Sequence, residues 1–320
     1  MAKKPGACDL RCNEAVLSAF LSNPAYSLDA ALVATGRRMV KSGNWAFARY
    51  LPPDAARDSL EGELPLIARK QQTTGLWFRK NAPILSYLIL LAIKRAGLLD
   101  EVRAKWFRHD AFAWFEKDDG ELGYIGRRNV IGTARPGDDG LQRRFVAAVA
   151  ALQQEDGSWG AAVSATALTM ERLLDLGCSP QGAIVGDGAA WLLAQYRDEV
   201  GFRRPKASWS ISMGHVFTTE DHGKEFLGAQ KALPHTKLAF SCFGCLPMTQ
   251  TALALRVLSR SGYHGDERVV KSFACLARLQ IKPEDIRGLA GNASPGDWCA
   301  HKCRFKLEDE AQDERRKRKP

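Results

Sequence analysis

Apolar and polar residues follow a helical period in the stretch that precedes Gly157. Leu141, Phe145, Val149 and Leu152 lie at helical spacing and fall on one side of a helix. Arg143 and Arg144 fall on the other side. This pattern predicts an amphipathic helix with one buried face.

A second kind of segment is apolar on nearly every side and stops at a glycine. Such a helix is expected to be buried all round. Glycine commonly follows a helix end, because it adopts the left-handed conformation without a steric penalty. We predict three helices of this kind: 83–96 before Gly97, 161–176 before Gly177, and 247–261 before Gly262.

A turn in which glutamine precedes Gly-x-Trp joins the two kinds of segment. Gln71 to Trp77 and Gln153 to Trp159 share one spacing. Looser copies run from Gln195 to Phe202 and from Gln280, across a long insertion, to Trp298; Ser42 to Trp45 is a degenerate first copy. Recurrence at tens of residues indicates a repeat architecture.

Amphipathic outer helices and buried inner helices predict an all-α fold, an α/α toroid in which helical hairpins form a barrel. We expect a single toroid domain over residues 1–305, with repeats clearest from residue 60, and a charged, disordered tail over 306–320. Two stretches break the alternation. The glycine-rich stretch 118–140 is predicted to be a loop, and the polar stretch 203–241 is predicted to be irregular.

The Gln-x-x-x-Gly-x-Trp turns, each followed by a helix that ends in glycine, resemble the repeats of the terpenoid cyclase and protein prenyltransferase superfamily, in particular squalene cyclase-like toroids. The resemblance covers residues 60–303. It implies that Gln71, Trp77, Gln153 and Trp159 are structural, since in that superfamily these residues tie turns to helix ends. It also implies a hydrophobic central cavity and action on an isoprenoid or other hydrophobic substrate.

The acidic motifs of that superfamily do not occur in this sequence. The pairs Asp118-Asp119 and Asp138-Asp139 lie in glycine-rich stretches and match neither Asp-x-Asp-Asp nor Asp-Asp-x-x-Asp. Asp297-Trp298-Cys299 has the Asp-x-Cys spacing of the prenyltransferase zinc site, but no histidine lies far downstream. Catalytic residues are therefore unassigned. A non-catalytic toroid that binds a ligand or a partner protein is the alternative function.

Charge and hydropathy favour a cytoplasmic protein. The net charge is +10, part of it from the basic run 315–319. No aromatic residues interleave with this run, so it does not favour nucleic acid as a partner over a solubilising tail. No signal sequence follows Lys3 and Lys4, and the most apolar stretch, 82–93, is too short to span a bilayer. Thiols stay reduced in the cytoplasm, which favours metal binding by cysteines.

Two close cysteine pairs predict a metal site. Cys242 and Cys245 form a Cys-x-x-Cys pair, and Cys299 and Cys303 form a second pair. Four thiolates at such spacings are typical of structural zinc, although iron or an iron–sulfur cluster is an alternative. His301 could replace Cys303 as the fourth ligand. Redox activity and unrelated buried thiols remain open alternatives.

Three further sets of residues are candidates with ordinary structural alternatives. Cys8 and Cys12 could join a metal site if the N-terminus folds back, and Cys178 and Cys275 are expected to be core thiols. His215 to His222, with His235, could transfer protons or could be a solvated loop. Six aromatic residues could line a cavity or simply form core: Trp106, Phe112, Trp114, Phe115, Trp191 and Trp209.

Overall fold

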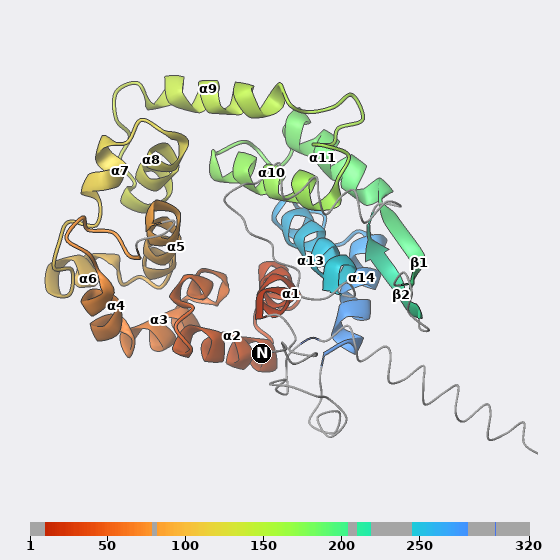
Figure 1. Ribbon diagram of the computed structural model, residues 1–320, viewed down its shortest axis with the longest axis horizontal. Helices are drawn as coiled ribbons and strands as arrows, with labels where there is room; N and C mark the ends of the chain where they lie inside the picture. Colours follow the sequence, from red (N-terminus) through yellow and green to blue (C-terminus); the bar gives the residue numbers. More distant parts are fainter. Residues whose placement is uncertain (1–9, 79–81, 204–209, 219–244, 281–297, 299–320) are drawn as a thin grey trace, which may run out of the picture. The chain divides into compact units, whose positions relative to one another are not determined.

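The computed structural model describes residues 10–78, 82–203, 210–218, 245–280 and 298 (Figure 1). Over these residues the protein is predominantly α-helical, as the hydrophobic pattern predicts. It divides into two compact units. Unit 1 holds the described residues up to Phe20, Gln154–Leu168 and those from Asp187 onward; unit 2 holds Leu21–Gln153 and Thr169–Gly186.

Over the described residues the chain is helical apart from one β-hairpin, which precedes the last two described helices. The elements are α1 (Leu10–Ser22), α2 (Ala30–Lys41), the 3-10 helix η1 (Trp45–Tyr50), α3 (Pro53–Glu61), α4 (Leu64–Lys70), α5 (Ala82–Arg95), α6 (Leu99–Lys105), α7 (Ala113–Lys117), α8 (Glu121–Gly126), the π-helical turn η2 (Arg127–Ile131), α9 (Asp138–Ala150), α10 (Val163–Asp175), α11 (Ala183–Ala194), β1 (Tyr196–Arg203), β2 (Ser210–Phe217), α13 (Cys245–Arg260) and α14 (Glu267–Arg278).

The three apolar helices are confirmed as α5, α10 and α13, each within two residues of its predicted bounds. The glycine after each helix has a positive φ, of +66°, +91° and +89°. Leu90, Met170 and Leu255, one from each helix, are fully buried. The amphipathic helix is confirmed as α9, where Val149 is buried, although Leu152 just beyond its end is 69% exposed.

The Gln–Trp turns share their hydrogen bonds. Gln71 forms an isolated antiparallel bridge with Trp77, and Gln280 forms the same bridge with Trp298 across the insertion. In both turns the indole N–H donates to the carbonyl oxygen of the residue four before the glutamine, at 2.8 and 3.0 Å. The prediction that Gln280 and Trp298 form a copy of the turn is therefore confirmed.

A second bond recurs at the aromatic residue that closes each turn. Its backbone N–H donates to a polar side chain of a helix with a buried face. The four bonds are Trp77 to Ser86 Oγ in α5 (2.8 Å), Trp159 to Thr166 Oγ1 in α10 (3.1 Å), Phe217 to Thr251 Oγ1 in α13 (3.0 Å) and Trp298 to Asn13 Oδ1 in α1 (2.7 Å). Each turn is thereby tied to one helix.

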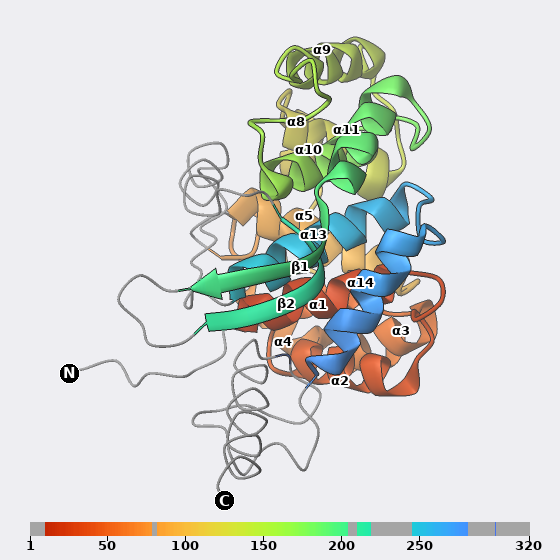
Figure 2. The ribbon, with the colours of Figure 1, turned by 90° about the vertical axis from the view of Figure 1, so that its right-hand side faces the viewer.

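The prediction for the third copy of the turn is wrong in its closing residue. Phe202 is not a turn residue: it pairs with Ile211 in the antiparallel hairpin of β1 and β2. Phe217, at the end of β2, makes the bond to α13 instead. The hairpin packs against α13 and α14 within unit 1 (Figure 2). The prediction of irregular structure over 203–241 is wrong for β2, and 204–209 and 219–241 lie outside the described residues.

The predicted loop over 118–140 is also wrong, because most of that stretch is helical. Its glycines permit close packing. A Cβ atom on Gly123 would lie 2.2 Å from the Asp118 carbonyl oxygen, and one on Gly126 would lie 2.4 Å from the Phe115 ring. The stretch therefore forms α8 and η2, packed tightly beside α7.

In the part of the chain that the structure describes, no single helix is long and apolar enough to cross a membrane. Helices α5 and α6 together meet the criteria of length and composition, but the chain bends by 114° between them.

Candidate functional site

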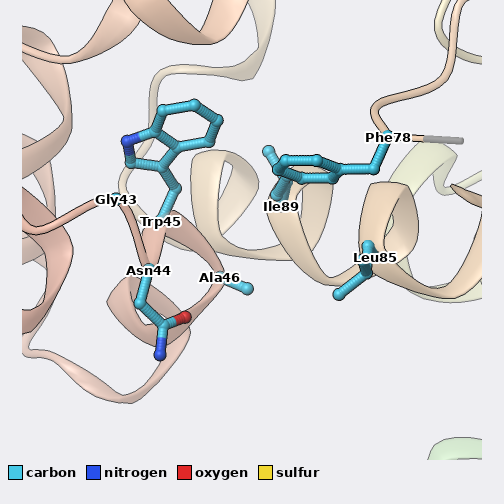
Figure 3. Close-up of a pocket in the computed structure, with 7 residues that line it drawn as sticks. All are labelled: Gly43, Asn44, Trp45, Ala46, Phe78, Leu85 and Ile89. Carbon is cyan, nitrogen blue, oxygen red and sulfur yellow. The ribbon is translucent and has the colours of Figure 1, made fainter. Parts of the chain in front are cut away.

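An apolar pocket of about 270 Å³ lies in unit 2, between the chain around η1 and the start of α5 (Figure 3). Its volume is just below the usual lower bound of about 300 Å³ for ligand pockets, so it suits a small ligand or one end of a longer ligand. The described lining residues are Gly43, Asn44, Trp45, Ala46, Phe78, Leu85 and Ile89.

Three segments bring the lining residues together. Gly43, at φ +97°, turns the chain after α2 so that η1 can begin at Trp45. Helix η1 packs directly against α5, where Leu85 and Ile89 are one turn apart and so share a face. Phe78 follows Trp77, the anchored residue of the first turn.

The indole N–H of Trp45 has a hydrogen-bond partner that is not one of the lining residues. The indole Nε1–H donates to Glu63 Oε2 at 3.0 Å, and the Trp45 side chain is 4% exposed. Among the described lining residues Asn44 has the only polar side chain, and Figure 3 shows its amide pointing away from the aromatic rings. The pocket therefore offers its occupant apolar surface without charge.

Two aromatic rings form part of the pocket wall. The ring centroids of Trp45 and Phe78 are 6.3 Å apart, and the ring planes are inclined by 25° (Figure 3). Trp45 is buried, whereas Phe78 is 39% exposed. The two rings therefore stack on each other, and the exposed part of Phe78 offers an aromatic surface to the pocket.

The aromatic residues that the sequence suggested for a cavity do not line this pocket. Phe112, Phe115 and Trp191 are buried, as expected of core residues. Trp106 and Trp114 are half-buried, and Trp209 lies outside the described residues. The degenerate turn Ser42 to Trp45 is the sequence feature that could have pointed to the pocket, because it supplies three of the lining residues.

The acidic pairs have structural partners. Asp138 accepts two hydrogen bonds from the Arg127 guanidinium, at 2.7 and 3.1 Å, and both side chains are buried. These hydrogen bonds hold the pKa of Asp138 below its usual value, in spite of the opposing effect of burial. Asp119 forms an ion pair with Arg135, and Asp118 accepts a bond from the Gly123 N–H.

His215 is the described member of the predicted histidine segment, and it lies in β2 rather than in a loop. Its Nδ1 atom is 2.7 Å from the Tyr196 hydroxyl and 3.7 Å from Asp198 Oδ1. Burial, with a smaller contribution from Asp198, raises the pKa of Tyr196 to about 12. Tyr196 therefore stays protonated at neutral pH, and its hydroxyl can donate to His215 Nδ1. His222 and His235 lie outside the described residues.

The predicted metal ligands lie at the limits of the described chain. Cys245 is the first residue of α13, while Cys242, Cys299 and Cys303 lie outside the described residues, as do His301 and Cys8. Over the ranges that can be described, no three His, Cys, Asp or Glu side chains form a group that could hold a metal ion.

Cys178 and Cys275 behave as core groups. Cys275 is buried, and its thiol donates to the Gly214 carbonyl oxygen. Cys178 is partly buried. Burial raises the pKa of both thiols, which disfavours the reactive thiolate.

Comparison with known proteins gave no family model, no curated protein and no solved structure that matches this chain.

Proposed function

We propose that this protein is an α/α toroid that binds an uncharged apolar small molecule in the pocket of unit 2. The observation that carries the proposal is the composition of that pocket: two aromatic rings, two aliphatic side chains and no charged side chain among its described lining residues. An isoprenoid chain has the matching chemistry, because its binding is driven by removal of apolar surface from water.

The recurring turn supports the toroid. Four aromatic residues donate a backbone N–H to four helices, and in the last turn the acceptor is Asn13 in α1, the first described helix. In the other three turns the acceptor lies in a helix that comes after the turn in sequence, whereas here it lies in the first described helix. A ring of helical hairpins requires this relation between its first helix and its last turn.

A structural metal at the cysteine pairs is part of the proposal. Cys245 begins α13, and Cys299 directly follows Trp298, which is buried and bonded to Asn13. Both anchors belong to unit 1. Zinc held by Cys242, Cys245, Cys299 and Cys303 would stabilise the last turn, because metal binding adds to folding free energy.

Binding is the function that the pocket supports. Its described lining residues offer no carboxylate or imidazole that could transfer a proton to a ligand. Action on an isoprenoid would need acid–base groups from elsewhere in the chain, whereas binding needs only the apolar walls described above.

Fluorescence of N-phenyl-1-naphthylamine, an uncharged apolar probe, tests the proposal. The probe should bind the wild-type protein in a saturable way. Leu85→Trp should fill the pocket and weaken probe binding by at least about tenfold, since one extra group in an apolar site is worth roughly 1–3 kcal/mol. Ile84→Trp is the matched control, because Ile84 is the adjacent, 38% exposed residue of α5. Equal binding by wild type and Leu85→Trp would contradict the proposal.

A further inference from the structure

The backbone of Phe78 has a conformation that is unfavourable for a bulky residue. Its φ is +65°, in the left-handed region where a side chain with a Cβ is strained. The residue before it explains how this conformation is held. Trp77 is fixed by its backbone N–H to Ser86 and by its indole N–H to Ile67, both at 2.8 Å.

The second turn shows which residue the backbone favours at this position. Trp159 corresponds to Trp77 and makes the same backbone bond, to Thr166. The residue that follows it is Gly160, at φ +69°. Both Gln-x-x-x-Gly-x-Trp turns therefore place a left-handed residue directly after their tryptophan, and glycine adopts that conformation without strain.

Core packing does not account for phenylalanine at this position. The Phe78 side chain is 39% exposed, whereas the preceding Trp77 is fully buried. The Phe78 ring instead lies beside Trp45 at the pocket (Figure 3). Strained residues that persist at such places indicate a functional role.

We infer that Phe78 is a ligand-contacting residue that makes the pocket selective for flat, unsaturated apolar groups over saturated chains. This inference rests on the proposed function and concerns the same pocket. The rings of Phe78 and Trp45 present two aromatic surfaces inclined by only 25°, and flat π systems gain additional stabilisation against such surfaces. A saturated chain gains only the burial of its apolar area.

Competition between two alcohols measures the selectivity. Farnesol and 3,7,11-trimethyldodecan-1-ol have the same branched carbon skeleton, but only farnesol has double bonds. Each is used to displace N-phenyl-1-naphthylamine from the wild type and from Phe78→Gly and Phe78→Leu. The wild type should prefer farnesol by about two- to tenfold, the range expected of aromatic contacts beyond area burial.

Both variants should lose that preference. Phe78→Gly should also bind farnesol about two- to tenfold more weakly, while its melting temperature stays at or above that of the wild type. Phe78→Leu retains apolar bulk and backbone strain, so its melting temperature should not rise. An unchanged preference in either variant, or a lower melting temperature for Phe78→Gly, would overturn the inference.

Failure of the inference and failure of the proposed function give different results. If Phe78→Gly binds and discriminates like the wild type while Leu85→Trp binds poorly, the pocket is the binding site but Phe78 does not select its ligand. If Leu85→Trp also binds like the wild type, the proposed function fails.

Discussion

Single hydrogen bonds at the turns determine where the helices of this protein are fixed. Without its acceptor, the backbone N–H of each of the four aromatic residues would be a buried donor with no partner, which costs about 1–3 kcal/mol. The acceptor side chains are not the same residue type: a serine, two threonines and an asparagine serve the same role.

Replacement of one acceptor by an isosteric apolar side chain should be costly. In Thr166→Val the shape is kept but the Trp159 N–H loses its acceptor, so we expect the free energy of unfolding to fall by about 1–3 kcal/mol. Urea denaturation measures the change. Thr133→Val, at an exposed position, is the control, and the same small effect from both variants would refute the proposed role of the bond.

The buried Arg127–Asp138 ion pair should make stability depend on pH. Because folding lowers the pKa of Asp138, its contribution is present above the unfolded value of about 3.9 and is lost as the pH falls through the lower folded value. Asp138→Asn leaves Arg127 without its counter-charge and should cost about 3–5 kcal/mol at pH 7.

The Asp138→Asn variant should also lose part of the acid sensitivity of unfolding. Asp139→Asn, an exposed neighbour in the same helix, is the control. Urea unfolding of both variants at pH 7 and below pH 4 makes the comparison. If the two variants are equally stable at pH 7, the ion pair does not have the structural role described.

At the scale of elements, the turns are held against the segments that follow them by glycines. A Cβ on Gly75 would lie 2.0 Å from the Asp110 carbonyl oxygen, and one on Gly157 would lie 2.6 Å from that of Asp187. Gln71 contributes to the same junction, because its side-chain oxygen accepts the backbone N–H groups of Arg108 and His109.

Gly75→Ala should therefore destabilise the protein far more than a glycine substitution where only φ is unfavourable. Gly262 has a similar φ of +89°, but a Cβ added there would meet no atom within 4 Å, so Gly262→Ala should cost about 1–2 kcal/mol. Thermal unfolding compares the two. If Gly75→Ala lowers the stability no more than Gly262→Ala does, the close approach of Gly75 to the Asp110 carbonyl group is contradicted.

Helix ends could be predicted from the sequence, but some turns and packed glycines could not. Gly97, Gly177 and Gly262 mark helix ends because the left-handed conformation is a local property. Gly123 and Gly126 are indistinguishable in the sequence from glycines that end helices. Their role is instead to allow close packing against Asp118 and Phe115, which depends on the tertiary fold.

The hairpin and the pocket could not be predicted for the same reason. Pairing of Phe202 with Ile211 joins residues on separate strands, whereas Gly201-Phe202 has the local sequence of a turn. Trp45 and Phe78 are far apart in sequence, and their contact depends on how η1 packs on α5. The sequence marks the degenerate turn at Trp45 but contains no local signal for its partner ring.

At the scale of the whole molecule, we predict a metal ion that stabilises unit 1. Purified protein should contain nearly one zinc or iron ion per chain, and the double variant Cys242→Ser/Cys299→Ser should lose both the metal and thermal stability. Elemental analysis and thermal melting measure the two effects. Metal-free protein, purified without chelators and no more stable than the double variant, would refute the metal site.

Calorimetric titration with farnesol tests most directly whether the protein binds an uncharged apolar molecule in the pocket beside Trp45. We expect one site per chain, a negative heat-capacity change from apolar burial, and loss of binding in Leu85→Trp but not in Ile84→Trp. No saturable heat in the wild type across several temperatures, or equal binding by wild type and Leu85→Trp, would contradict binding in this pocket.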